Sequence, residues 1–196
     1  SWQNVSADLH IATPVLFDTG IITSAGGMTV TAGKVTNQGG TLQAVDGMTF
    51  NNVGEFYNNR GTEHNHQGSL TLNATHLWNE SGSIESAGDL TGYLGQYDSD
   101  GAARLVAQRA MMLSLSGMLA NNGLLGGSTS LTVSAASIQN GGQGHLLSDQ
   151  GDVNLKAVQG SIENQGIIEE RNAFGQLVLS APSVRNGGTL LSAGTI

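Results

Sequence analysis

Apolar and polar residues alternate over short segments along the whole chain. Pairs of apolar residues separated by one position occur at Met28/Val30, Met48/Phe50, Leu70/Leu72, Leu113/Leu115, Leu131/Val133, Val153/Leu155 and Leu177/Leu179. Because successive side chains of a strand point to opposite faces, each pair predicts a short strand with one buried face. Helical spacing is nearly absent, and the best helical candidate, residues 102–112, overlaps positions that the strand pattern already uses.

The strand segments belong to a longer repeat that begins with an asparagine or aspartate, which we call the anchor. The repeat reads NQGGTLQAVDGMTF from Asn37 and NGGTLLSAG from Asn186. An apolar residue lies two positions before the anchor, with Asp98 as the exception, and a small residue lies two positions after it. The anchors are expected at Asp18, Asn37, Asn59, Asn79, Asn121, Asn140, Asn164 and Asn186, with Asp100 between Asn79 and Asn121. Their mean spacing is about 21 residues, which is typical of a solenoid.

A repeat of this length, with two or three short strands and turns rich in asparagine and glycine, predicts an all-β protein. The fold expected is a parallel β-helix of about nine coils. Asparagine tolerates the left-handed backbone conformation, and its amide can bond an identical amide in the next coil. The glycine two positions later is expected to supply a positive φ. Pro14 and Pro182 both lie four residues before an anchor, so we expect one corner of the coil to lie outside the hydrogen bonds between strands.

Composition and charge narrow the classes of function. The chain has 29 glycines, 5% aromatic residues and 11% charged residues, which suits a repetitive β architecture better than a compact enzyme. A net charge of −8 argues against nucleic acid and anionic membranes as partners, because these need basic patches. The absence of cysteine excludes disulfides and thiolate metal sites. No apolar run approaches the ~18 residues of a transmembrane helix.

Two segments contain residue types that bind metals. The segment EHNHQ places His64 and His66 on one face of an extended strand, with Glu63 adjacent, but a third ligand of defined spacing is missing. The segment DSDG at residues 98–101 lacks the rest of a calcium-binding loop. We interpret both segments as turns and expect neither a metal site nor a cofactor.

A polysaccharide lyase or hydrolase on this fold would need carboxylates from neighbouring coils gathered in one groove. The close cluster of acidic and basic residues comprises Asp89, Asp98, Asp100, Arg104 and Arg109, and its spacing defines no groove. We therefore expect no catalytic residues, and a glycan-degrading enzyme is retained only as an alternative.

Exposed aromatic side chains are the remaining candidates for a binding surface, because they stack on sugars and anchor protein interfaces. Trp78 follows the buried Leu77 position and should therefore point outward. The candidate surface comprises Trp78, Tyr93, Tyr97, Asp98, Asp100 and Arg104. A segment that binds a receptor or a glycan directly is accordingly a second functional hypothesis.

The repeat can be written N-x-G-G-T-L-x-x-x-G-x-x-T followed by an apolar residue, as seen at Asn37, Asn79 and Asn186. It resembles the haemagglutinin repeat of filamentous haemagglutinin and related exoproteins of two-partner secretion, including the stalks of contact-dependent growth-inhibition toxins. The resemblance covers the chain from about Asp8 to Ile196. It implies a right-handed parallel β-helix that is exported unfolded through an outer-membrane transporter barrel and displayed on the bacterial surface or secreted.

The resemblance also implies a role. In such an exoprotein the chain would be a structural shaft segment that supports adhesion, or delivery of a toxin, to a target cell bearing a receptor or glycan. Residues 1–196 are expected to form a single segment, an interior piece of a longer filament. The unit at residues 92–104 has lost the anchor asparagine and the apolar row, which predicts an irregular coil. An open end of a β-helix is an exposed strand edge, so end-to-end self-association is a further expectation.

Overall fold

The described residues form a parallel β-solenoid. The computed structural model describes residues 2–4 and 7–196, which contain 23 strands and no helix, so no helix of the described chain crosses a membrane. The pairings between these strands are all parallel. The expected parallel β-helix of about nine coils with roughly 21 residues per coil is therefore confirmed.

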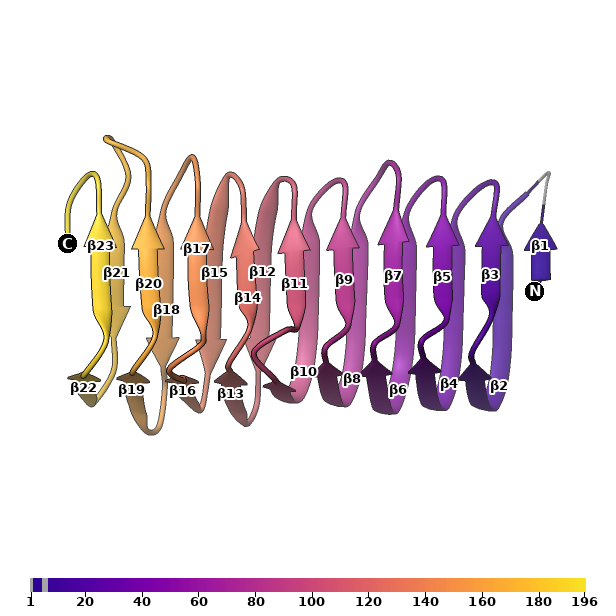
Figure 1. Ribbon diagram of the computed structural model, residues 1–196, viewed down its shortest axis with the longest axis horizontal. Coiled ribbons are helices and arrows are strands. Elements are labelled where there is room, and N and C mark those ends of the chain that lie inside the picture. Colours follow the sequence, from indigo (N-terminus) through magenta and orange to yellow (C-terminus); the bar gives the residue numbers. More distant parts are fainter. Residues whose placement is uncertain (1, 5–6) are drawn as a thin grey trace.

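One side of the solenoid is a ten-stranded sheet. Its strands, in order, are β1 (Trp2–Asn4), β3 (Ile21–Ser24), β5 (Thr41–Ala44), β7 (Thr62–Asn65), β9 (Ser83–Ser86), β11 (Arg104–Ala107), β14 (Leu124–Gly127), β17 (His145–Ser148), β20 (Ile167–Glu170) and β23 (Thr189–Ser192). Each strand is the single short segment that one coil contributes to this side (Figure 1).

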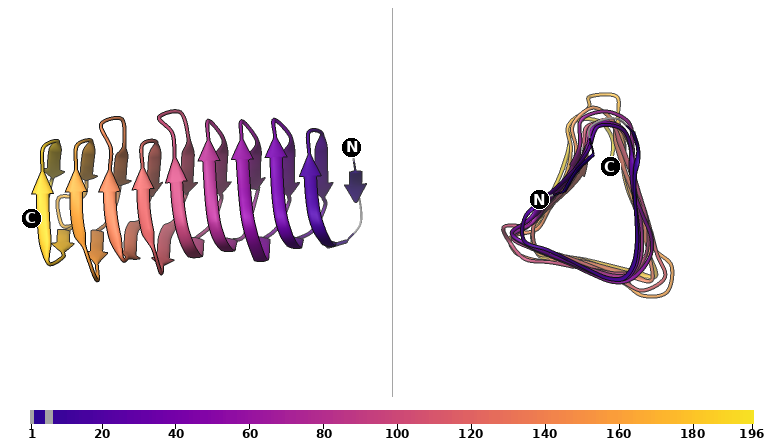
Figure 2. Two further views of the ribbon diagram at one scale, coloured as in Figure 1. Left: turned by 90° about the horizontal axis from the view of Figure 1, so that it is seen from below. Right: turned by 90° about the vertical axis from the view of Figure 1, so that its right-hand side faces the viewer.

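The other two sides belong to a 13-stranded sheet that bends around a corner. In the first half of the chain one long strand per coil covers both sides: β2 (Leu9–Asp18), β4 (Met28–Gln38), β6 (Met48–Asn59), β8 (Leu70–Glu80) and β10 (Leu90–Ser99). In the second half the strand divides into two, with β12 (Ala110–Leu115), β15 (Ser130–Ala135), β18 (Val153–Ala157) and β21 (Leu177–Ser180) on one side and β13 (Met118–Asn121), β16 (Ser137–Asn140), β19 (Ser161–Asn164) and β22 (Ser183–Asn186) on the other. Viewed along its axis the rod is a triangle (Figure 2).

The coil is right-handed, as the resemblance implied. In Figure 1 the chain rises along the near sheet, crosses to the far side at the top and descends there while it advances from right to left. Right-handed crossovers are the general rule for parallel strands, because a right-twisted strand packs back onto its sheet in that sense.

Columns of apolar side chains fill the interior, since equivalent residues of successive coils lie side by side. The column that begins each long strand contains Met28, Met48, Leu70, Leu90, Met111, Leu131, Val153 and Leu177, all at most 2% exposed. The expected pair Leu113/Leu115 is therefore two residues out of register, because Met111 and Leu113 are the residues that lie beside Leu131 and Val133. A strand of six residues with apolar side chains at 111, 113 and 115 offers two equivalent pairs, and only pairing with its neighbours selects one.

The unit at residues 92–104 retains its place in the stack. Strand β10 pairs with β8 on one side and with β12 and β13 on the other. The apolar position before the anchor is filled by Tyr97, which is fully buried, and not by Asp98 as expected. Residues 102–112, the helical candidate, form parts of β11 and β12.

Pro14 lies at the corner where the first two sides meet. Strand β2 pairs with β4 at Thr13 and again at Val15, so Pro14 falls between the two stretches of paired residues. Pro182 lies between β21 and β22, at the equivalent corner. Gly33 and Gly54 occupy the same corner, where a Cβ on Gly54 would lie 2.6 Å from the Gly33 carbonyl oxygen. Small or donor-free residues therefore line this corner, as the two prolines predicted.

Truncation of one buried column residue tests this packing. Leu125 is fully buried in β14, whereas the preceding Leu124 points outward. We expect Leu125→Ala to lower the free energy of unfolding by about 2–5 kcal/mol, because it leaves a cavity between adjacent coils. Leu124→Ala is the matched control and should cost less than roughly 1 kcal/mol. Denaturant unfolding followed by circular dichroism measures both, and equal losses would contradict the assigned register.

Candidate functional sites: an asparagine ladder and an outward aromatic column

The anchors form one column at the corner between β2 and β3 and its equivalents. The structure places Asp18, Asn37, Asn79, Asn121, Asn140, Asn164 and Asn186 in this column, as expected, and all but Asn186 are buried. Two positions differ from the prediction. Asn58, not Asn59, pairs with Asn37 and Asn79, and Ser99, not Asp100, follows Asn79. We call this column the asparagine ladder.

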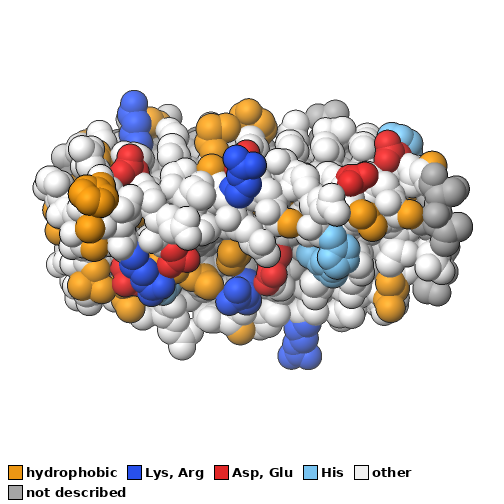
Figure 3. All heavy atoms as spheres, turned by 90° about the horizontal axis from the view of Figure 1, so that it is seen from above, with side chains coloured by type: hydrophobic (Ala, Val, Ile, Leu, Met, Phe, Trp, Pro, Cys, Tyr) orange, Lys and Arg blue, Asp and Glu red, His pale blue; other side chains and the backbone are white. Residues whose placement is uncertain are grey.

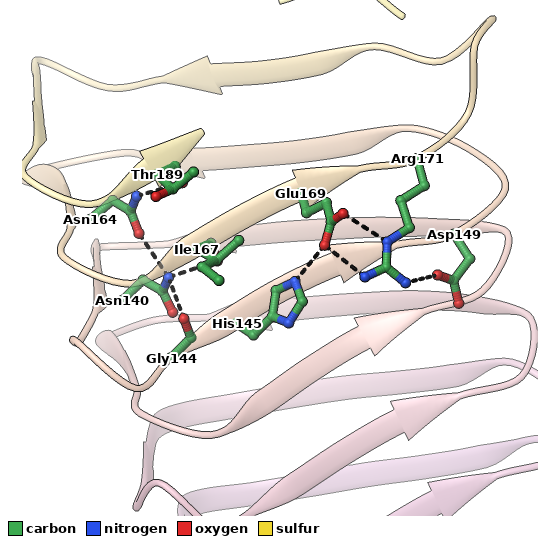
Figure 4. A network of polar contacts seen from close by, with 9 residues as sticks. All are labelled: Asn140, Gly144, His145, Asp149, Asn164, Ile167, Glu169, Arg171 and Thr189. Carbon is green, nitrogen blue, oxygen red and sulfur yellow. Dashed lines mark hydrogen bonds and ion pairs between the residues drawn. The ribbon is translucent and has the colours of Figure 1, made fainter. Parts of the chain in front are cut away.

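Side-chain amides join the coils of the ladder. Asn121 Nδ2 donates to Asn140 Oδ1 at 2.9 Å, Asn140 Nδ2 to Asn164 Oδ1 at 2.8 Å, and Asn164 Nδ2 to Asn186 Oδ1 at 2.7 Å. The same nitrogen of Asn140 also donates to the carbonyl oxygens of Gly144 and Ile167 (Figure 4). An amide carries both donors and an acceptor, so identical residues can satisfy one another along the column. Asn121, Asn140 and Asn164 thereby each connect their own turn to the next coil.

The backbone explanation for the anchors was wrong in two respects: no anchor asparagine has a positive φ, and among the described glycines two positions after an anchor only Gly39 has one. Among the described residues, the positive φ values at this corner belong to Gly39, Arg60 and Ser81, two positions after the anchors, and no asparagine adopts one. In the first coils the glycines that matter sterically, Gly40, Gly61 and Gly82, lie three positions after the anchors, whereas in later coils Gly123, Gly166 and Gly188 lie two positions after them. A Cβ on Gly82 would lie 2.3 Å from Asn58 Nδ2, so the ladder packs directly on this glycine.

Spacing to that glycine is a signal that could have located the anchor correctly. Asn37 and Gly40 are separated by three positions, as are Asn79 and Gly82. The same spacing from Gly61 identifies Asn58, whereas counting two positions selects Asn59. With Asn58 as the anchor, the apolar position before it is Phe56, which is fully buried.

An aromatic column occupies the outward face between the proline corner and the ladder. Tyr57 of β6 stacks on Trp78 of β8 with ring centroids 4.2 Å apart and planes at 1°. His76 stacks on Trp78 with centroids 3.4 Å apart and planes at 18°. Lys34 Nζ lies 4.6 Å from the Tyr57 ring centroid, and His76 Nε2 lies 2.5 Å from Asp98 Oδ2. The contacts run from a cation through three rings to a carboxylate across four coils.

Trp78 therefore offers no free ring face. Two parallel rings so close to the indole centroid would overlap one another on a single face, so Tyr57 and His76 lie on opposite faces. Hollows of about 250 Å³ and 220 Å³ lie beside Trp78, and Glu80 lines both. The aromatic column stabilises the stack of coils, because its cation–π and stacking contacts connect side chains of adjacent coils.

Of the other predicted surface residues, Asp98 and Asp100 line the hollow of about 220 Å³ beside Trp78, whereas Tyr97 and Arg104 do not. Tyr97 lies in the core, and burial raises the pKa of its hydroxyl to about 12. Asp100 caps the ladder corner by accepting from the Ser81 backbone N–H at 2.8 Å and the Ser81 hydroxyl at 2.7 Å. Although partial burial opposes it, these hydrogen bonds lower the pKa of Asp100. Arg104 lies on the ten-stranded sheet, 3.4 Å from Glu85.

The cluster considered for catalysis is likewise divided. Asp98 belongs to the aromatic column and Asp100 to the ladder corner, whereas Asp89 and Arg109 form an ion pair at 3.7 Å between the end of one coil and the start of the next. Asp98 and Asp100 line one hollow beside Trp78, whereas Asp89 and Arg109 lie at a different corner, so the cluster as a whole does not meet in one groove.

Tyr93 is the predicted residue with the most open surroundings. It is 51% exposed on β10, between Asn73 of β8 and Ser114 of β12. A shallow hollow of about 530 Å³ lies beside it, lined by Val53, Asn73, Ala74, Thr75, Tyr93, Leu94, Gly95, Ser114 and Ser116. No charged side chain lines this hollow. The lining combines an exposed ring with amide and hydroxyl groups.

The histidine segment makes no metal cluster. His64 and His66 lie edge to face with ring centroids 5.2 Å apart, whereas Glu63 turns into the core. Within the described residues, no group of three or more histidine, aspartate and glutamate side chains is arranged to hold a metal ion.

Sequence reasoning missed a polar network on the ten-stranded sheet. Glu169 accepts from Arg171 and lies 2.9 Å from His145 Nε2, while Arg171 also donates to Asp149 at 2.9 Å (Figure 4). The hydrogen bond from Arg171, with that from His145, lowers the pKa of Glu169 despite desolvation. The four residues come from β17, β20 and the turns after them, so only the stacking of coils brings them together. On the face drawn in Figure 3, basic side chains are scattered singly, several beside acidic ones, and no basic patch appears.

Comparisons with known proteins agree with this architecture. Residues 4–92, 67–168 and 173–196 match the family model of the haemagglutinin repeat. The toxin CdiA of Escherichia coli is 27% identical over 221 residues, which cover 98% of this chain and 6% of the length of that toxin. No solved structure matches the chain.

Removal of one ladder amide tests its contribution. Asn140→Ala deletes the donor to Asn164, Gly144 and Ile167 and the acceptor of Asn121. We expect the free energy of unfolding to fall by about 2–4 kcal/mol, because buried partners are left unsatisfied. Asn122→Ala, at the exposed position beside Asn121, should change it by less than roughly 0.5 kcal/mol. Similar values for both variants would show that the ladder contributes little.

Proposed function

The chain belongs to the haemagglutinin-repeat family, and we propose that it is a structural shaft segment of a large bacterial exoprotein that is secreted or displayed on the cell surface. In this role it supports adhesion, or delivery of a toxin, by carrying another part of the protein to a target-cell receptor or glycan. The similarity to CdiA favours toxin delivery as one version of this role. Residues 1–196 would then be one interior segment of a longer filament.

The observation that carries the proposal is the unbroken parallel stack of coils. Each coil hydrogen-bonds only its neighbours, so length grows with the number of repeats while the cross-section stays constant. The ladder and the aromatic column add side-chain bonds along the axis. Such a rod resists bending and extension, which are the mechanical properties a spacer requires.

The same stacking suits export through an outer-membrane transporter barrel, the partner we propose for secretion. A coil that has emerged presents a strand edge on which the next coil can pair, so folding proceeds from coil to coil. An open end of such a stack is an exposed strand edge, so end-to-end association of a separated segment belongs to the proposal.

Removal of one whole coil from the full-length protein tests the shaft role. Asn121 and Asn140 are 19 residues apart on the ladder, so deletion of residues 122–140 joins equivalent positions. We expect normal surface display and retained target-cell binding, because the rod is shortened but its register is kept. Deletion of residues 122–131 is the control that breaks the register, and it should abolish display. Lost target-cell binding by a normally displayed whole-coil deletion would show that this segment contacts the target itself.

A second candidate function is direct binding of a glycan at Tyr93. The ring is exposed, and the hollow beside it is lined by hydroxyl and amide groups without charge. These groups match an uncharged sugar, whose C–H face stacks on a tyrosine and whose hydroxyls bond amides and hydroxyls. Asp89 lies apart from Asp98 and Asp100, and this division gives no comparable support to a lyase or hydrolase.

A glycan array probed with the chain and two variants tests this candidate. Tyr93→Ala should lose binding to neutral glycans at least tenfold, because the stacking surface is removed. Met112→Ala, at a 43% exposed position on the neighbouring strand β12, is the matched control and should bind normally. Equal binding by both variants, or no neutral glycan bound by the native chain, would exclude the site.

A further inference from the structure

The asparagine ladder has a gap between Asn37 and Asn58. Asn37 Nδ2 donates to Glu63 Oε1 at 2.6 Å and makes no bond to Asn58 Oδ1. Asn58 Oδ1 consequently has no hydrogen-bond partner, although it is buried. The two amides remain close, because Asn37 Nδ2 and Asn58 Oδ1 each lie 2.3 Å from the position that a Cβ on Gly61 would take. Glu63 has thus taken the donor that the ladder pattern would give to Asn58.

Glu63 stands at a position that is otherwise apolar. The inward column of the ten-stranded sheet contains Ile22, Leu42, Ile84, Leu105, Leu125, Leu146 and Ile168 besides Glu63. Glu63 is fully buried, and its second oxygen, Oε2, has no partner. A buried carboxylate with an unsatisfied oxygen is costly, whereas a neutral carboxyl group carries a hydroxyl donor. The interior therefore holds an orphaned carboxyl oxygen on Glu63 and an orphaned amide oxygen on Asn58, at one corner of the same coil.

We propose that Glu63 holds a proton and that its Oε2 hydroxyl donates to Asn58 Oδ1, which closes the gap in the ladder. In this form the carboxyl group accepts from Asn37 through one oxygen and donates to Asn58 through the other. Loss of the proton removes the donor and leaves two buried acceptors, Glu63 Oε2 and Asn58 Oδ1, without a hydrogen-bond partner. Glu63 is then a proton-dependent link between the coils of Asn37 and Asn58.

The electrostatic surroundings favour the neutral form. Burial raises the pKa of Glu63 to about 8 from 4.5, against the lowering effect of the Asn37 hydrogen bond, and the Asp18 carboxylate raises it further. The neighbours on the adjacent strands, Leu42 and Ile84, carry no charge. Glu170 is also buried but has hydrogen-bond donors beside it, since it accepts from the Ser192 hydroxyl at 2.8 Å and from Gly194 N at 3.2 Å.

The sign of the pH dependence follows from the pKa of Glu63, which is 4.5 in the unfolded chain and about 8 in the folded chain. Between pH 4.5 and about 8 the folded chain keeps a proton on Glu63 that the unfolded chain has released. Stability from this group is therefore complete below pH 4.5 and is lost as the pH rises through about 8. Over that interval the folding equilibrium constant should fall by close to tenfold per pH unit, and above it the dependence should end.

Glu63→Gln tests the link, because its Nε2 supplies a permanent donor to Asn58 while its Oε1 still accepts from Asn37. Denaturant unfolding of the native chain from pH 5 to 9 should show a free energy of unfolding that falls as the pH rises. The Glu63→Gln variant should lack this part of the pH dependence. Glu163→Gln, at a 40% exposed side chain, is the control and should keep the native slope. Glu63→Leu provides a second variant that restores the apolar column and should also lack the slope.

A direct measurement distinguishes a proton on Glu63 from a bound cation. The Glu63 carboxyl carbon, followed by NMR in the folded native chain, should titrate with a midpoint near pH 8. A midpoint near 4.5, or an unchanged slope in both Glu63 variants, would overturn the proposal. Stability at pH 9 that rises with calcium or sodium concentration in the native chain alone would also overturn it, by assigning the site to a cation. None of these results bears on the shaft role, which rests on the stack of coils.

Discussion

Hydrogen bonding between successive coils is the constraint on which the rest of the structure depends. Parallel pairing at nearly the same register in every coil places each residue beside its equivalents in the coils before and after. A residue type is therefore tolerated where it can lie against copies of itself. Apolar side chains satisfy this condition by packing, and the resulting columns of leucine, methionine, isoleucine and valine form most of a narrow core.

Asparagine satisfies the same condition at a buried corner because one side chain carries both donors and an acceptor. Serine substitutes at residue 99, where its hydroxyl donates to Asn121 at 3.1 Å. A carboxylate has no donor, so Asp18 at the start of the ladder leaves one oxygen, Oδ2, without a hydrogen-bond partner. The chemistry of an amide, rather than a left-handed backbone, explains why this position repeats.

Outward positions are less constrained, because water can hydrogen-bond a polar side chain that has no matching neighbour in the next coil. Side chains there range from the stacked Tyr57 and Trp78 to the open surroundings of Tyr93. Stacking can also cancel a binding role, since the ring faces that would meet a sugar at Trp78 are covered by its neighbours. An exposed ring face therefore distinguishes Tyr93, the candidate binding residue, from Trp78, whose ring is covered in the aromatic column.

The sequence by itself determined the strand content, the period and the parallel β-helix, because these follow from alternation and from a repeat too short to bury its own apolar face. It also identified most anchors and the proline corner. Only the tertiary structure decided the register where two alignments were equivalent, as at Asn58 against Asn59 and at Met111 against Leu115. It also decided that Tyr97 is buried, that Trp78 is covered and that Glu63 interrupts the ladder. Such outcomes depend on contacts between residues about one coil apart, and spacing along a single chain does not specify which side chain a neighbouring coil brings to each position.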